Sequence, residues 1–228
     1  MNSGYFSRTS ESSFIFNLLT YLDYVLFNLL SKILVVHRLR PFPRSFYERN
    51  PAQVARELLG KVLVHRSPEG TTSGKIVETE AYFGRGDPAS RASRKRTKLN
   101  ELMWWRGGLA FIYMVHAKWM FNVTAEREGT PGAVLIRALE PADGIELMKS
   151  RRGVEDKKLL TSGPGRLTQA MGITYDHHKL DLTRSRVLTV LDDTFTNFKI
   201  ARSHRIGVSA DLKQELRFFI RENPFVSK

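Results

Sequence analysis

The 228-residue chain contains no cysteine. A disulfide scaffold, a thiolate nucleophile and a zinc site built on cysteine are therefore excluded, although this absence does not fix the cellular compartment. Acidic residues are also scarce, because 23 Asp and Glu stand against 36 Lys and Arg, which gives a formal net charge of +13. The positive electrostatic potential of such a chain attracts polyanions or anionic lipid rather than cationic ligands, and nucleic acid is the first partner to consider.

The sequence also lacks an internal repeat, a glycine-rich nucleotide-binding fingerprint and a nucleophile triad. His177 and His178 are adjacent, but neighbouring side chains diverge and no third ligand stands at a suitable spacing. We therefore expect a solvated loop there, no metal site and no cofactor. With 42% hydrophobic and 11% aromatic residues, the chain has the material for a core, which excludes a largely disordered protein.

An apolar segment with only two charged side chains occupies residues 13–36. Its length suits a bilayer-spanning helix, but its polar residues recur at spacings of three and four. That periodicity favours an amphipathic helix that docks on a membrane surface or on a protein. A membrane span, and an untranslated or poorly ordered extension, are the alternatives. Because short segments separated by turn residues begin near residue 44, we expect residues 1–44 to be an N-terminal extension that lies outside the main domain.

Residues 45–228 are predicted to form a single compact domain, which keeps the basic excess because the first 44 residues hold only five basic and two acidic side chains. Asn50, Pro51 and Gly60 are typical of a capped helix between them. Strands are expected over 61–66, 74–82, 109–115, 132–140, 186–191 and 216–220, and further helices over 141–150 and 165–172. Because these strands follow one another without regular helical crossovers, the order favours an α+β domain with a mixed, mostly antiparallel sheet.

The clearest candidate for a catalytic motif is IVETEAY, residues 76–82, which contains two acidic side chains. With the period-two alternation of a strand, Ile76, Glu78, Glu80 and Tyr82 share one face. The two carboxylates are then roughly 7 Å apart beside an aromatic ring. That separation leaves room for a water, as in hydrolysis with inversion at a sugar carbon. The alternative is a strand edge that carries two solvated acids.

A basic segment follows directly, with seven Lys or Arg and two acidic residues over 85–106. It is interleaved with Trp104 and Trp105, and more aromatic residues come soon after it. Cationic groups beside stacking surfaces are typical of proteins that handle unstacked bases. A solvated basic loop is the alternative.

Six sequence blocks, in order, carry a family resemblance: GKIVETEAYFGRGDPAS, a β-rich run ending in FNV, GAVLIRALEP, SGPGRLTQAMGI, HRIGV and LRFFIRENPFVS. From about residue 56 to residue 227 the chain closely resembles the alkyladenine (3-methyladenine, methylpurine) DNA glycosylase family. The resemblance implies a curved sheet flanked by helices, with a protruding DNA-intercalating β-hairpin. It also implies a monofunctional enzyme that flips a damaged purine out of duplex DNA and hydrolyses its N-glycosidic bond with an activated water.

The resemblance assigns roles residue by residue. Glu80 matches the general base, and Tyr82 matches the ring that stacks on the flipped base. Arg137 matches the arginine close to the catalytic water and the DNA backbone, with an ordinary strand ion pair as the alternative. Asn122 matches the asparagine that excludes the 2-amino group of guanine, with a hairpin-turn asparagine as the alternative. Further DNA contacts are expected from Arg94, Arg96 and Lys98.

Two places depart from the family pattern. A histidine usually follows the DPAS-like run, whereas this chain has Arg91, which can donate and stack but cannot accept a hydrogen bond. We therefore expect cationic lesions such as 3-methyladenine to be disfavoured relative to hypoxanthine or ethenoadenine. In IYMVHAKWMFN, one deleted residue makes Tyr113 the second stacking ring and His116 the intercalating wedge. Without the deletion Ile112 and Val115 take those places, but a stacking pocket needs a π face.

The expected partners are double-stranded DNA with damaged purines and water as co-substrate, with a membrane or protein contact through residues 13–36 as a further option. We expect a monomer in the cytoplasm and nucleoid, or in the nucleus of a eukaryote. Two other function classes stay open. One is a catalytically silent DNA-binding module of the same fold, against which the presence of both Glu80 and Tyr82 argues. The other is a basic domain attached to a membrane.

Overall fold

The computed structural model describes residues 40–193 and 197–227. The chain divides between Arg40 and Pro41. The predictions for the segment 13–36 therefore lie outside the described residues. Within the described part of the chain, no helix combines the length and the apolar character that crossing a membrane requires.

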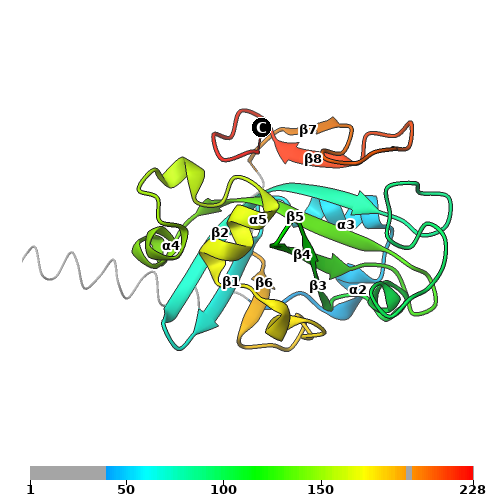
Figure 1. Cartoon of the computed structure of the whole chain (residues 1–228), viewed down its shortest axis with the longest axis horizontal. Helices are drawn as coiled ribbons and strands as arrows, with labels where there is room; N and C mark the ends of the chain where they lie inside the picture. Colours follow the sequence, from blue (N-terminus) through cyan, green and yellow to red (C-terminus); the bar gives the residue numbers. More distant parts are fainter. Residues whose placement is uncertain (1–39, 194–196, 228) are drawn as a thin grey trace, which may run out of the picture. The chain divides into compact units, whose positions relative to one another are not determined.

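In the described part of the chain, a curled antiparallel sheet of eight strands forms the centre of the domain (Figure 1). The spatial order is β3-β4-β5-β2-β1-β6, and β8 pairs with both β2 and β7. The predicted α+β class with a mostly antiparallel sheet is confirmed, since every pairing among the described strands is antiparallel. The strands are β1 (Val62–Ser67), β2 (Gly70–Tyr82), β3 (Ala110–Val115), β4 (Lys118–Thr124), β5 (Ala133–Pro141), β6 (Leu188–Leu191), β7 (Ile200–Ser203) and β8 (Arg217–Ile220).

Strand β2 lies at the centre of the sheet. It pairs with β5 along one side, while β1 and then β8 share its other side. The alternative of an edge strand with two solvated acids is therefore wrong, because Glu78 and Glu80 are both fully buried. The register against β5 shifts twice, so that Val77 on β2 and Arg137 on β5 are extra residues. The predicted alternation of faces does not extend back to Ile76, which packs with Val77 in the main core.

Within residues 40–193 and 197–227, four α-helices flank the sheet: α2 (Arg44–Tyr47), α3 (Pro51–Leu58), α4 (Ile145–Arg152) and α5 (Pro164–Met171). The predicted cap of α3 is confirmed, since the Asn50 side chain accepts a hydrogen bond from the Ala52 N–H at 3.0 Å. Helix α4 begins later than the pattern indicates, because β5 continues through Pro141. Strand β7 and helix α2 were not foreseen, since each has only four residues and neither shows a clear period.

Apolar side chains gather in two clusters. The main core fills the space between the sheet and its helices, with Tyr47, Leu58, Phe121 and Ile136 among its fully buried members. A second, smaller cluster lies under the segment that joins β2 to β3 and consists of Ala92, Leu102, Met103, Leu109, Phe111 and Ala133. Three of these belong to the basic segment 85–106, so that segment is anchored to the domain and is not a freely solvated loop.

Candidate active site

Glu80 is a buried carboxyl near the end of β2. One oxygen, Oε2, accepts a hydrogen bond from the Tyr82 hydroxyl at 2.6 Å. The other, Oε1, accepts from the backbone N–H of Ile206 at 2.8 Å and lies 3.2 Å from a guanidinium nitrogen of Arg137. Burial raises the pKa of Glu80, and these three partners only partly oppose the rise. A carboxyl with a raised pKa is a stronger base once it is ionised, which suits it to take a proton from water.

Glu78, two residues earlier, has the opposite environment. Its Oε1 accepts from Nε of Arg137 at 2.8 Å, from Nε of Arg217 at 2.7 Å and from the Ser227 hydroxyl at 2.8 Å. Its Oε2 accepts from the Ser227 N–H at 2.7 Å. Although burial alone raises the pKa of Glu78, these donors hold it below its usual value. Two neighbouring carboxyls whose pKa values are pushed apart have different tasks. Glu78 is the permanent anion, and Glu80 is free to titrate.

Arg137 connects the two acids. Its Nε binds Glu78, its NH1 contacts Glu80 and its NH2 donates to the Ser227 hydroxyl at 3.3 Å. The side chain is nearly buried, with only 6% of its surface exposed. It is therefore an ion-paired residue and also a direct neighbour of the predicted base. Because it is the extra residue of β5, its side chain is placed by a bulge that the sequence alone does not reveal.

A buried salt-bridge network centred on Arg205 lies against the ring of Tyr82. The Arg205 guanidinium lies 4.7 Å from the centroid of that ring and donates to Asp87 at 2.7 and 2.8 Å. It also donates to the Ala81 carbonyl and to Asp211. Sequence reasoning gave no role to Arg205 or Asp87, although both stand in blocks that carry the family resemblance. The network ties the loop before Arg91 to the loop that presents the Ile206 amide.

The four residues predicted to bind the base meet around one small cavity. Tyr82, Arg91, Tyr113 and Asn122 line it together with Ala89, Met103, Phe111 and Ala133, and its volume is about 20 Å³. Tyr82 belongs to this cavity and also bonds to Glu80, so the predicted base and the predicted slot are direct neighbours. Asn122 lies within β4 and donates to the Phe111 carbonyl at 3.1 Å. The alternative of a hairpin-turn asparagine is therefore wrong.

The hairpin of β3 and β4 turns through two residues. His116 and Ala117 both have positive φ, 47° and 57°, as a two-residue turn of type I′ requires. His116 is exposed at this tip. Ile112, which the alignment without a deletion would make the stacking residue, is 1% exposed in the main core. Tyr113 instead faces the cavity, which agrees with our choice of alignment. The protrusion of the hairpin and its insertion into DNA stay predictions.

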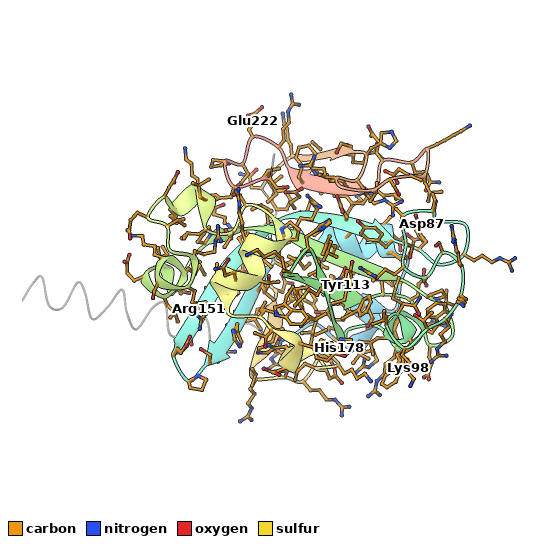
Figure 2. All side chains as sticks on the ribbon, in the orientation of Figure 1. Asp87, Lys98, Tyr113, Arg151, His178 and Glu222 are labelled. Atoms are coloured by element: carbon orange, nitrogen blue, oxygen red, sulfur yellow. The ribbon has the colours of Figure 1, made fainter. Side chains whose placement is uncertain are left out.

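The predicted DNA-contacting residues Arg94, Arg96 and Lys98 are all exposed, in the segment between β2 and β3. Figure 2 shows Lys98 at the margin of the domain and Tyr113 further inside, over the strands. Asn100 holds the segment in shape, since its side-chain amide donates to the carbonyls of Arg91 and Lys95. The cations are thus presented by an ordered loop, and their contact with DNA stays a prediction.

The predicted solvated loop at His177 and His178 is wrong. His177 Nε2 lies 2.9 Å from Nε2 of the buried His65, and Nδ1 of His178 accepts from the Ile112 N–H at 3.1 Å.

His65 and His177 line a larger cavity, of about 890 Å³, that shares no residue with the small one. Of these two cavities, the small one is connected to the predicted base, since Tyr82 lines it and donates a hydrogen bond to Glu80. Over residues 40–193 and 197–227, no group of three or more His, Asp or Glu is placed to hold a metal ion.

Comparison with known proteins agrees with this geometry. The family model described as methylpurine-DNA glycosylase matches residues 45–224. A protein of Salinibacter ruber named "Putative 3-methyladenine DNA glycosylase" is 40% identical over 201 residues, which cover 83% of this chain and 97% of that protein. Proteins of the same name from Methanoculleus marisnigri and Bacillus subtilis are 42% and 38% identical, over 82% of this chain in each case and over 98% and 97% of their own lengths.

Proposed function

The chain belongs to the methylpurine-DNA glycosylase family, and we propose that it excises alkylated or deaminated purines from duplex DNA. The observation that carries the proposal is the buried Glu80 carboxyl with its raised pKa, bonded to Tyr82 at the edge of an aromatic cavity. A glycosylase needs a slot that receives an extruded base and a base that activates water beside it. The match to the family spans residues 45–224, which include Glu80, Tyr82 and all the residues that line the small cavity.

In the proposed reaction the damaged purine leaves the duplex and stacks between Tyr82 and Tyr113. Ionised Glu80 accepts a proton from a water molecule as the water oxygen attacks C1′ of the deoxyribose. The bond between C1′ and the purine nitrogen breaks, and its electron pair leaves with the base. The carboxylate also faces the positive charge that develops on the sugar. Arg137 limits the rise in the pKa of Glu80, so that the ionised form is available.

Selectivity is proposed to come from two side chains of the cavity. Asn122 is fixed by its hydrogen bond to the Phe111 carbonyl, and a rigid side chain excludes a normal guanine better than a mobile one. Arg91 places a permanent positive charge where a base would enter, which disfavours cationic lesions relative to hypoxanthine and ethenoadenine. Single-turnover rates on matched hypoxanthine and 7-methylguanine duplexes test this. Faster excision of the cationic base, with a ratio that Arg91→His leaves unchanged, would contradict it.

The proposed partner is a DNA duplex, held by the exposed Arg94, Arg96 and Lys98 and entered by His116 from the hairpin tip. Phosphate contacts of this kind fix the position of a protein on DNA without reading its sequence. We further propose that the protein acts as a monomer on DNA in the cytoplasm and nucleoid, or in the nucleus of a eukaryote.

The decisive experiment incubates the protein, and its Glu80→Gln variant, with a duplex that contains one hypoxanthine or one alkylated purine. Hot alkali then cleaves the strand at any abasic site. Cleavage with the parent and none with the variant is the expected result. If the parent binds the duplex but removes none of these bases, the enzyme proposal fails and the silent DNA-binding module takes its place.

A further inference from the structure

The small cavity between Tyr82 and Tyr113 is already occupied by a side chain of the protein. The guanidinium carbon of Arg91 lies 4.0 Å from the centroid of the Tyr113 ring, which is the distance of a stacked cation–π pair. The cavity that remains measures about 20 Å³, enough for a water molecule but not for a purine. Arg91 therefore covers one face of the Tyr113 ring and lines the same cavity as that ring.

The backbone on both sides of Arg91 is fixed. Before it, Asp87 accepts the Ala89 N–H at 3.2 Å and is itself held by the buried Arg205. After it, Ala92 is buried in the second apolar cluster, and the Arg91 carbonyl accepts from the Asn100 amide at 2.7 Å. Motion of the whole loop would break these contacts.

The Arg91 side chain is held through a single neighbour, Tyr113. The residue is exposed, and its guanidinium has a ring contact and a side-chain hydrogen bond, both with Tyr113, and no salt bridge to another described residue. A long cationic side chain on an anchored backbone can leave the cavity by rotation about its own bonds. Once outside, it reaches solvent or a DNA phosphate, to which a guanidinium donates readily.

We propose that Arg91 is a gate, whose guanidinium stacks on Tyr113 in the free protein and must leave before a flipped base takes its place. This inference rests on the proposed function and adds the way in which access to the slot is controlled. A cation–π contact at an exposed site favours the closed position of the Arg91 side chain over the open one by a factor of about two to five. The gate thus lowers the apparent flipping equilibrium by that factor even for a neutral base, separately from the proposed effect of its charge on cationic lesions.

Stopped-flow fluorescence with an ethenoadenine duplex measures the step directly, because the fluorescence of this base changes when it unstacks. The protein carries Glu80→Gln so that flipping is observed without excision. Arg91→Ala is compared with Arg85→Ala, which removes the same charge from the same loop at an exposed residue outside the cavity. Both variants are expected to bind undamaged duplex more weakly. Only Arg91→Ala is expected to raise the flipping equilibrium, by about two- to fivefold.

The outcomes separate the gate from other roles. Arg91→Lys keeps the charge but loses the planar group, and its flipping equilibrium should fall between those of the parent and Arg91→Ala. Equal flipping in the Arg91→Ala and Arg85→Ala proteins would overturn the gate. Weaker flipping in Arg91→Ala would also overturn it, since Arg91 would then hold the flipped base instead of competing with it. If the protein with Glu80 intact excises no base and no fluorescence change occurs, the proposed function itself has failed.

Discussion

Two substitutions on the same strand, Glu78→Gln and Glu80→Gln, are expected to have opposite effects on stability. In Glu78→Gln the amide group replaces an oxygen that accepts the Ser227 N–H, so two donors would face each other. The change also removes the charge that compensates Arg137 and Arg217, both of which are nearly buried. Breaking a buried ion pair in this way costs about 3–5 kcal/mol. For a domain of this size that corresponds to a fall in melting temperature of roughly 6–20 °C.

Glu80→Gln removes a charge that the fold does not favour. The raised pKa means that ionising Glu80 costs stability, so a neutral isostere is expected to leave the free energy of unfolding unchanged or to increase it. The glutamine oxygen can accept the Ile206 N–H, and its amide can donate to the Tyr82 hydroxyl oxygen, so the bond between the two side chains is kept with its direction reversed.

Urea titration at pH 7, followed by circular dichroism, gives the free energy of unfolding of both variants and of the parent. The pH dependence has opposite signs at the two sites. The stabilisation from Glu78 is present above the usual pKa of a glutamate and is lost as the pH falls through its lowered value. The contribution of Glu80 is lost as the pH rises through its raised value. If both variants were destabilised equally at pH 7, the assignment of one anchoring and one titrating carboxyl would be refuted.

Three further predictions concern the neighbours of Glu80. The single-turnover rate of excision should rise with pH through the raised pKa of Glu80, and a profile with no rise above pH 4.5, the ordinary pKa of a glutamate, would exclude this carboxyl as the base. Tyr82→Phe keeps the ring but removes the hydrogen bond that favours ionised Glu80, so the pH profile should move to higher pH while ethenoadenine flipping stays as in the parent. Arg205→Met leaves Asp87 buried without its cation and should cost about 3–5 kcal/mol in urea titrations, whereas the exposed Arg85→Met should change stability by less than about 0.5 kcal/mol.

The elements that the sequence predicts well are those with a strong local pattern. The helix after Asn50 has a cap, a proline and an apolar stripe in a few consecutive residues, and β5 is a mostly apolar run interrupted by Arg137 and Glu140. The position of β2 at the centre of the sheet depends on which strands come to pair with it, and no local pattern reports that. The bulge at Val77 is invisible for the same reason, since it is a property of the pair β2 and β5.

The site divides in the same way. The resemblance and the strand period together brought Glu80, Tyr82 and Arg137 to one place, and the structure has them in contact. The different fates of the two glutamates were not predictable, because the partners that fix Glu78 stand 139 and 149 residues later in the chain. The block HRIGV contributes to the family resemblance, but its sequence does not predict the contacts that it makes. In the structure Arg205 lies against the Tyr82 ring, and the Ile206 N–H donates to Glu80.

The arrangement of charges explains how a buried carboxyl can have the properties that the proposed base requires. A buried glutamate with no cation nearby would stay protonated, and one with a full ion pair would be too weak a base. Arg137 gives its closer contact, 2.8 Å, to Glu78 and a longer one, 3.2 Å, to Glu80. The second arginine of the network, Arg217, also binds Glu78 and not Glu80. The fold therefore satisfies the anion that it needs for stability, and it leaves Glu80 with part of one positive charge. That partial compensation is what permits Glu80 to ionise and still to accept a proton.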